Sequence, residues 1–176
     1  MNNLTFLSSR DFAVDKAPKG LVLVNNQKGI MFCMFHADPA KCPFCEEAIP
    51  EFKRLASKMP SVKFGLININ RDKEVWVMST KTIAPIDRVP YMILYLNGRP
   101  LMRYDGEKTL DKMMKFLDDV VSRLNNKKDF YENKNFKFES DIPVFVNTPQ
   151  FNVICDDQNG VCYVKSDAAY IPNQKR

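Results

Sequence analysis

The chain has 176 residues, of which 45% are hydrophobic and 27% are charged, and its formal net charge is +5. This composition is typical of a globular protein, and it excludes a disordered or fibrous chain. The small positive excess is mixed with acidic residues along the sequence, so we expect no nucleic-acid partner.

The N-terminus shows no targeting pattern, and no later segment is an uncharged apolar run of membrane-spanning length. We therefore expect a cytoplasmic protein with no signal peptide and no membrane partner. Because the cytosol keeps thiols reduced, the five cysteines are expected to be catalytic, metal-binding or buried thiols rather than a framework of structural disulfides.

The first predicted elements lead to a pair of cysteines. Residues 21–24 and 30–35 are short, nearly continuous apolar runs, which predict strands buried on both faces of a sheet. Apolar residues then recur at helical spacing over residues 44–59. Cys42 therefore lies where a strand gives way to a helix.

The middle of the chain alternates strands and helices. A strand, a short helix, two strands and a final helix are predicted over residues 62–69, 74–78, 91–96, 101–104 and 110–124. Asn97-Gly98 is a turn signal between the two adjacent strands, and Thr109 can cap the final helix. The order βαβαββα predicts an α/β fold with a mixed central sheet and helices on both faces.

The composition changes after the last predicted helix. Residues 125–140 are rich in Asn, Lys, Asp and Phe, and we interpret them as a solvated arm that docks on its own domain or on a partner. Beyond the arm, residues 151–155 and 161–164 enclose a polar loop and predict a β-hairpin. We therefore expect one domain over residues 1–124 and a C-terminal extension over residues 125–176.

The motif Cys42-Pro43-Phe44-Cys45 at a helix start has a definite chemical use. Unpaired N–H groups, the positive end of the helix dipole and the adjacent Lys41 all stabilise a thiolate at Cys42. Pro43 suits the first helical position, where its missing N–H would be unpaired. Cys45 lies one turn further and can attack a mixed disulfide. Half of a zinc site has the same spacing, so a metal-binding alternative stays open.

Three separately placed motifs resemble the thioredoxin superfamily, and the resemblance covers roughly residues 20–124. They are Phe35-His36-Ala37 with the cysteine motif, Arg88-Val89-Pro90 before a predicted hairpin, and Tyr104-Asp105-Gly106 before the last helix. The cysteine motif itself is similar to the glutaredoxin form, and the chain also resembles thioredoxin-like proteins of large DNA viruses. The resemblance implies a thioredoxin fold, followed here by the extension with its hairpin.

The same resemblance implies the roles of the site residues. Cys42 and Cys45 would be the catalytic pair, and a cis bond before Pro90 would face them. In the family, backbone groups beside this proline pair with an extended substrate strand. The expected substrate-binding residues are Val89, Pro90 and Phe44.

These features predict a thiol–disulfide oxidoreductase that acts on protein disulfides as reductase, oxidase or isomerase, with no cofactor and no metal. Two departures favour an alternative. Thioredoxins carry a buried Asp and a Lys where this chain has Met34 and Leu66. The alternative is a thioredoxin-fold structural or interaction module, which binds an assembly partner through the C-terminal arm.

Three other residues have more than one interpretation. His36, the only histidine, is a proton relay near Cys45 or fills a packing position. Cys155 and Cys162 can face each other in the predicted hairpin. They would then be a second redox pair, a structural disulfide, two unconnected thiols, or part of a four-cysteine zinc site with the first pair.

Overall fold

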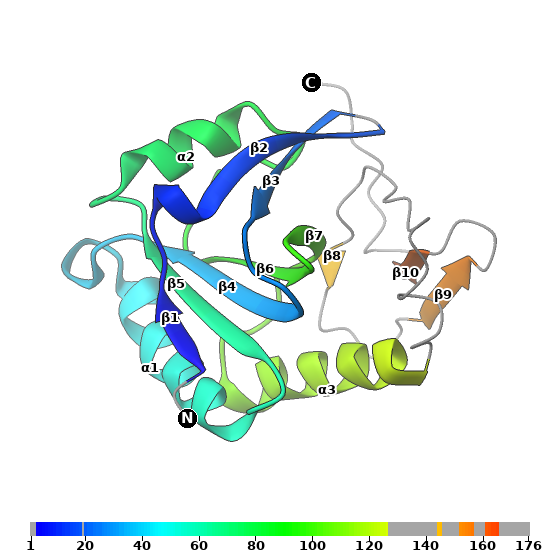
Figure 1. Ribbon diagram of the computed structural model, residues 1–176. Coiled ribbons are helices and arrows are strands. Elements are labelled where there is room, and N and C mark those ends of the chain that lie inside the picture. The colour runs from blue at the N-terminus through cyan, green and yellow to red at the C-terminus, as the bar shows by residue number, and fades with distance from the viewer. Residues whose placement is uncertain (1–2, 19, 127–143, 146–151, 157–160, 166–176) are drawn as a thin grey trace.

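The computed structural model describes residues 3–18, 20–126, 144–145, 152–156 and 161–165 (Figure 1). Its helices are η1 (Ser9–Asp11), η2 (Pro39–Lys41), α1 (Pro43–Lys58), α2 (Lys73–Thr80) and α3 (Leu110–Asn126). Its strands are β1 (Leu4–Phe6), β2 (Phe12–Ala17), β3 (Gly20–Asn25), β4 (Ile30–His36), β5 (Lys63–Asn68), β6 (Tyr91–Leu96), β7 (Arg99–Tyr104), β8 (Val144–Phe145), β9 (Asn152–Asp156) and β10 (Val161–Lys165). None of the described helices is long and apolar enough to span a membrane.

A mixed sheet of six strands forms the centre of the fold, in the order β1-β5-β4-β6-β7-β8. β1, β5 and β4 are parallel, β6 runs antiparallel to both of its neighbours, and β8 is parallel to β7. The parallel neighbours β4 and β5 are connected through α1, since parallel strands need a crossover. The predicted α/β class with a mixed central sheet is therefore confirmed.

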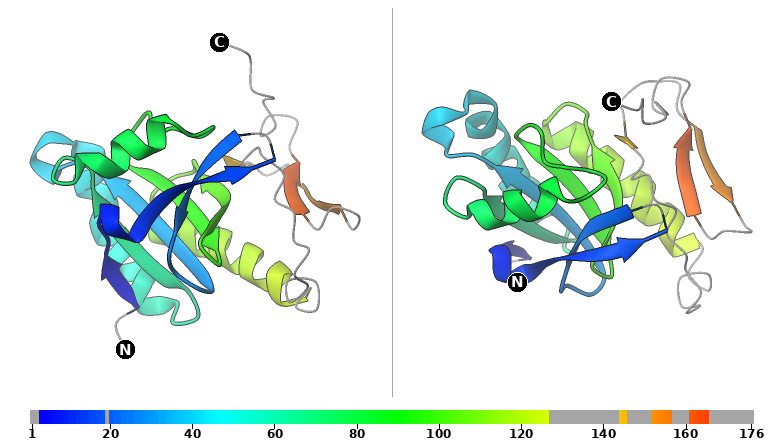
Figure 2. Two further views of the ribbon diagram at one scale, coloured as in Figure 1. Left: turned by 45° about the horizontal axis from the view of Figure 1, so that its top comes forward. Right: turned by 90° about the horizontal axis from the view of Figure 1, so that it is seen from above.

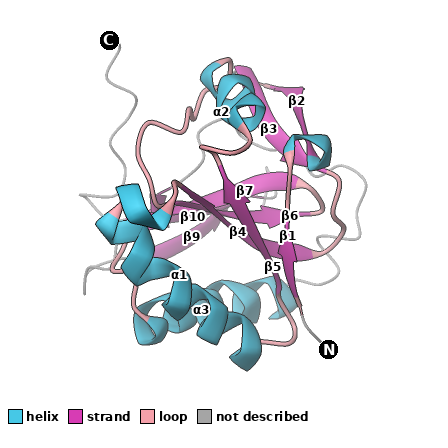
Figure 3. Cartoon of the chain, turned by 90° about the vertical axis from the view of Figure 1, so that its left-hand side faces the viewer, coloured by secondary structure: helices cyan, strands magenta, loops and turns pink. Residues whose placement is uncertain are grey.

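Helices cover both faces of this sheet (Figure 3). α1 and α3 lie together on one face, and α2 lies on the other with the β2–β3 hairpin. Along β4, Phe32 and Met34 belong to the α1–α3 core, whereas Met31, Cys33 and Phe35 belong to the α2 core. This two-sided burial explains the continuous apolar run of β4. The chain leaves this buried strand at its C-terminal end and enters the cysteine motif through η2.

The N-terminal strands differ from the prediction. Residues 21–24 do lie in a strand, β3, but this strand pairs antiparallel with β2 in a two-stranded sheet of its own. Val22 and Leu23, which point to opposite faces of the strand, are both buried, whereas Leu21 is exposed, so the predicted burial on both faces holds only for the middle of the strand. The edge position beside β5 is taken instead by β1, which has only three residues. A strand this short is not recognisable from the alternation of apolar residues.

The turn at Asn97-Gly98 connects β6 and β7, as predicted. Asn97 has φ 49° and Gly98 has φ 83°, and two successive positive values are those of a type I′ turn. The N–H of Asn25 donates to the carbonyl oxygen of Gly98 at 2.8 Å. A Cβ at position 98 would collide with the carbonyl oxygen of Asn25. Glycine is therefore required here both by the backbone conformation and by the close approach of β3.

The C-terminal extension contributes strands in two places. β8 pairs with the last two residues of β7 at the edge of the central sheet. β9 and β10 form the predicted hairpin, which lies on the side of the molecule away from the start of α1 (Figure 2). Most of the predicted arm lies outside the described residues, and the domain boundary at residue 124 stays a prediction.

Candidate active site

The start of α1 holds the cysteine motif. Cys42 is the N-cap residue of the helix, and Pro43 occupies its first turn, where a proline costs no hydrogen bond. The N–H of Cys45 points back to the first sulfur and donates to Cys42 Sγ at 3.2 Å. Cys42 and Cys45 form a disulfide, with their Cα atoms 5.2 Å apart. After reduction, the same N–H group and the helix dipole would stabilise a thiolate at Cys42.

The two cysteines differ in access from solvent. Cys42 keeps 8% of its surface exposed, whereas Cys45 is fully buried at 0%. Phe44, between them in sequence, is 73% exposed. A substrate sulfur can therefore approach Cys42 from outside, whereas Cys45 is placed to attack from within the protein.

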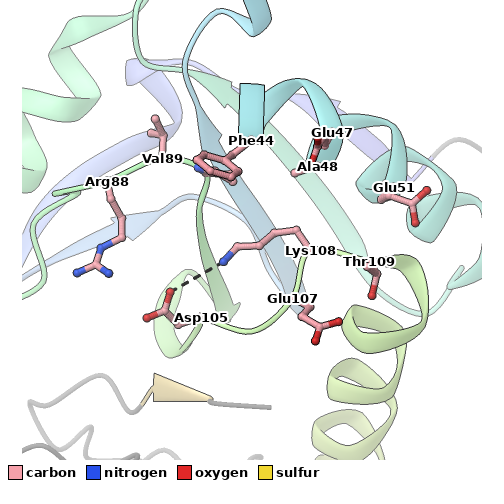
Figure 4. A pocket seen from close by; sticks show the side chains of 11 residues that line it. Phe44, Glu47, Ala48, Glu51, Arg88, Val89, Asp105, Glu107, Lys108 and Thr109 are labelled. Carbon is pink, nitrogen blue, oxygen red and sulfur yellow. Dashed lines mark ion pairs between the residues drawn. The ribbon is translucent and has the colours of Figure 1, made fainter. Parts of the chain in front are cut away.

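A groove of about 530 Å³ opens beside the exposed ring of Phe44 (Figure 4). Residues of α1, of the segment before β6 and of the loop before α3 line it: Phe44, Glu47, Ala48, Glu51, Arg88, Val89, Pro90, Asp105, Glu107, Lys108 and Thr109. The peptide bond between Val89 and Pro90 is cis. All three residues expected to bind substrate, Phe44, Val89 and Pro90, thus line one groove. Their role in binding stays a prediction.

Hydrogen bonds and ion pairs hold several charged residues of the groove in place. These contacts could not be predicted from the sequence. Glu51 of α1 accepts a hydrogen bond from the N–H of Leu110 at 2.8 Å, which joins α1 to the first turn of α3. This bond, with the guanidinium of Arg54, holds the pKa of Glu51 below its usual value. Lys108 Nζ lies 3.9 Å from the carboxylate of Asp105, and burial lowers the pKa of Lys108.

The core contains an apolar pair where thioredoxins carry an Asp and a Lys. Met34 of β4 and Leu66 of β5 are directly paired across the two strands. Both are buried in the same cluster as Ala48, one turn after Cys45 in α1. A thioether cannot accept a proton, so the acceptor that the resemblance would supply to Cys45 is missing at this position.

His36 lies at the end of β4 and is buried. Its Nδ1 is 2.9 Å from the carbonyl oxygen of Ala37, so a neutral ring donates its proton there. Burial lowers the pKa of His36, although this hydrogen bond and the nearby Asp38 oppose the shift. The proton-relay role of His36 stays a prediction, as does the tuning role of Lys41, which is exposed at the end of η2.

Cys33 has a different environment from the motif cysteines. It is a free thiol, fully buried in the α2 core, and burial raises its pKa far above the usual value. A neutral, enclosed thiol is a poor nucleophile, so Cys33 is an inert core residue.

The second cysteine pair lies far from the first. Cys155 and Cys162 are direct partners in the register of β9 and β10, and this hairpin and the start of α1 lie on opposite sides of the molecule (Figures 1 and 2). A zinc site formed by all four cysteines of one chain does not fit this arrangement, since ligands of one ion must converge within a few ångströms. Among the residues described with side chains, no group of three or more His, Cys, Asp or Glu could hold a metal ion.

The fold is similar to solved thioredoxin-fold structures. The J-Trx1 fragment of ERdj5 aligns with a TM-score of 0.51 and 14% identity, over 68% of this chain and 52% of the fragment. Human ERp44 in its zinc-bound form aligns with a TM-score of 0.50 and 16% identity, over 66% of this chain and 30% of that protein. This chain therefore spans about half or less of these proteins. Together with the sheet topology, these likenesses confirm the predicted thioredoxin fold.

Relatives in sequence are viral. The uncharacterized protein 196R of Invertebrate iridescent virus 6 is 26% identical over 125 residues, which cover 68% of this chain and 72% of the relative. The uncharacterized protein 020R of Invertebrate iridescent virus 3 is 26% identical over 172 residues, which cover 95% and 96%. The predicted resemblance to viral thioredoxin-like proteins is thus confirmed.

The thioredoxin family model matches residues 21–119, which is more than half of the chain. The matched segment contains the disulfide-bonded pair Cys42 and Cys45, and also Val89 and Pro90 from the groove. By its sequence, its sheet and its cysteine motif, the chain belongs to the thioredoxin family.

Proposed function

We propose that this protein exchanges disulfides with protein substrates through Cys42 and Cys45. The observation that carries the proposal is the Cys42–Cys45 disulfide at the N-terminus of α1, beside an open groove. The family match supports it, because the matched segment includes both cysteines. We place the reaction in the cytoplasm, where a cysteine pair of this kind rests as a dithiol and cycles through a disulfide.

In the reducing direction, the Cys42 thiolate attacks one sulfur of a substrate disulfide. A bond forms between Cys42 Sγ and that sulfur, the substrate S–S bond breaks, and the other substrate sulfur leaves as a thiolate that takes up a proton. Cys45 loses its proton, attacks Cys42 Sγ and releases the first substrate sulfur. The substrate gains two electrons, and the Cys42–Cys45 disulfide forms. A dithiol donor then restores the pair, and the reverse sequence oxidises a substrate dithiol.

The groove offers a place for the substrate segment next to its disulfide. The exposed ring of Phe44 gives an apolar contact, and the backbone beside Val89 and Pro90 can pair with an extended strand. The groove lining carries four acidic and two basic residues. Substrates with basic residues near the disulfide are therefore favoured by charge complementarity.

A trapping experiment tests the proposal with a synthetic peptide disulfide that carries basic residues. Reduced Cys45→Ser protein should form a stable adduct between Cys42 and the peptide, because the resolving thiol is gone. Wild-type protein should turn the peptide over without an adduct, and Cys42→Ser should do neither. Cys33→Ala is the matched control and should keep turnover, since Cys33 is buried in the α2 core. Adducts and products are measured by mass spectrometry.

The competing hypothesis is a thioredoxin-fold interaction module without exchange activity. The apolar pair Met34 and Leu66 is the observation that favours it, because Cys45 then lacks the usual proton acceptor. It predicts no adduct with Cys45→Ser, and it predicts the same slow peptide reaction for the wild type and for the Cys42→Ser/Cys45→Ser double variant. Either result would remove the proposed exchange reaction.

A further inference from the structure

The C-terminal hairpin places two cysteines opposite each other. In the register of β9 and β10, Cys155 pairs with Cys162, with Ile154 and Tyr163 as the next pair along the strands. Directly opposed residues of antiparallel strands have Cα atoms about 4.5–5.5 Å apart. Disulfides occur at Cα separations of about 4.4–6.8 Å. The backbone register alone therefore gives the two cysteines the spacing that a disulfide requires.

This spacing depends on the register, which makes the placement specific. If the pairing slipped by one residue, each cysteine would face a different position, and the two would lie on opposite faces of the hairpin. The site described above uses neither cysteine, and the hairpin and the start of α1 lie on opposite sides of the molecule (Figure 1). Electron exchange between the two pairs must therefore take place between two molecules rather than within one.

We propose that Cys155 and Cys162 form a second dithiol–disulfide couple, which the Cys42–Cys45 disulfide of another copy of this chain oxidises. The transfer step rests on the exchange activity proposed above, whereas the existence of the couple does not. One hairpin thiolate attacks Cys42 Sγ of the other copy, and Cys45 leaves as a thiolate. The second hairpin thiolate then attacks the first hairpin sulfur, and Cys42 leaves.

The step balances without a further reactant. One S–S bond breaks at Cys42–Cys45 and one forms at Cys155–Cys162, so two electrons pass from the hairpin to the motif. The two hairpin thiols lose one proton each, and Cys42 and Cys45 take up one proton each. In a reducing compartment the hairpin couple rests as a dithiol and is oxidised only when the motif carries a disulfide.

The positions of the lysines allow each cysteine site to be followed separately. Trypsin cleaves after lysine, so Cys33 lies in peptide 29–41, the motif pair in peptide 42–53, and the hairpin pair in peptide 138–165. The first experiment equilibrates the full-length Cys42→Ser/Cys45→Ser variant in glutathione buffers of graded potential, then alkylates free thiols after unfolding. We expect peptide 138–165 to change in one step from the doubly alkylated form to an unalkylated form. The mass of this form should be two hydrogen atoms below that of the dithiol peptide, as a disulfide requires. Peptide 29–41 should stay alkylated throughout.

Cys155→Ser in the same background is the matched control, and its Cys162 should form no intramolecular disulfide. If peptide 138–165 stays fully alkylated in every buffer that oxidises peptide 42–53 of the wild type, the hairpin couple is contradicted. The proposed exchange at Cys42 and Cys45 would be unaffected by that result.

The second experiment tests the transfer. Oxidised Cys155→Ser/Cys162→Ser protein, which keeps the motif disulfide, is mixed with reduced Cys42→Ser/Cys45→Ser protein, which keeps the hairpin thiols. We expect one disulfide to appear in peptide 138–165 for each disulfide lost from peptide 42–53. A hairpin that oxidises in glutathione but not with this donor would overturn the transfer step. Failure of the same oxidised donor to oxidise any peptide dithiol as well would instead contradict the proposed function.

Discussion

At the level of single residues, the surroundings of Cys42 and Cys45 assign the two sulfurs different tasks. Cys42 has a helix N–H directed at its sulfur and a small exposed surface. Cys45 is enclosed. Where the resemblance would place an acid in the core beside it, this chain has Met34. Thiolate formation is therefore favoured at Cys42 and disfavoured at Cys45. We expect the resolving attack by Cys45 to be the slow step of exchange.

Met34→Asp should speed this resolving step, because a carboxylate at position 34 could accept the proton of Cys45. General-base assistance would raise the rate on the order of tenfold or more. The gain should appear only at a pH above the pKa of the new carboxyl group, which burial would raise. Release of a preformed Cys42–peptide adduct, followed by quenched flow, measures the rate.

Met34→Asn is the matched control for this change. Both variants bury a polar group in the α1–α3 core, which costs roughly 1–3 kcal/mol of unfolding free energy, but only Asp can accept a proton. Equal release rates for the two variants would show that proton transfer from Cys45 does not limit exchange.

Phe44→Ala should weaken substrate binding without unfolding the protein. The ring is 73% exposed at the edge of the groove, so its loss should change the unfolding free energy by about 0.5 kcal/mol or less. Loss of its contact with substrate should raise KM roughly fivefold, which corresponds to about 1 kcal/mol. Phe6→Ala is the matched control, since Phe6 in β1 is equally exposed at 73% and does not line the groove. A similar KM for both variants would exclude Phe44 from binding.

The stability of the protein between about pH 7 and pH 5 tests the state of His36. Burial lowers its pKa in the folded protein from the ordinary value of 6.5. As the pH falls through 6.5, the unfolded chain binds a proton that the folded chain does not yet bind, so stability falls. His36 is the only histidine, and His36→Gln should flatten this loss. Urea unfolding at several pH values measures the unfolding free energy. If the variant loses as much stability as the wild type when the pH falls, a buried, neutral His36 is contradicted.

The cysteine pair could be predicted from the sequence because its chemistry is local, whereas Val89 and Pro90 were expected only through the family resemblance. Cys42 and Cys45 are three residues apart at a helix start, and this spacing by itself gives their geometry. Glu51 and Lys108 were not predicted, because each acts through a partner or a groove that forms only when α1 meets the loop before α3. In the sequence, an acidic residue on the exposed side of a helix gives no sign that its carboxylate will accept a hydrogen bond from another helix.

At the level of elements, the strength of the local pattern decided which predictions were correct. β4 and β6 are buried runs of six or seven residues, and the Asn97-Gly98 turn fixes the hairpin after β6. β3 has the same apolar character as β4, and the pattern cannot show that its partner is β2 rather than the central sheet. A run of apolar residues shows that a strand forms, but it does not show which strand is the partner, even where the partner is the preceding strand.

Gly98→Ala tests the close packing of the β6–β7 turn against β3. Gly98 and Gly29 both have φ 83°, so alanine carries the left-handed conformational cost at either position, about 1 kcal/mol or more. Only at position 98 would the new Cβ meet the carbonyl oxygen of Asn25, whereas nothing lies within 4 Å at position 29. Gly98→Ala should therefore lose at least about 1 kcal/mol more unfolding free energy than Gly29→Ala. Equal losses in urea unfolding would exclude the steric contribution.

At the level of the whole molecule, the C-terminal hairpin and the start of α1 lie on opposite sides (Figure 1). The chain order βαβαββα and the mixed character of the central sheet could be predicted, because α/β connections allow few arrangements. The position of β8 could not, since its two residues join β7 from a segment whose composition indicates a solvated arm. An extension that adds an edge strand to the sheet couples the C-terminal part of the chain to the domain that carries the cysteine motif.

Exchange at Cys42 and Cys45 is tested most directly by a single-turnover reaction of the reduced, full-length Cys155→Ser/Cys162→Ser protein, which lacks the hairpin thiols, with an equal amount of a protein disulfide. Samples are quenched by alkylation, and peptides 29–41 and 42–53 are measured by mass spectrometry. The predicted result is that peptide 42–53 loses both alkylation sites at the rate at which the substrate gains two thiols, while peptide 29–41 stays alkylated. Substrate reduction with peptide 42–53 still doubly alkylated, or no reduction at all, would contradict a redox-active Cys42–Cys45 pair.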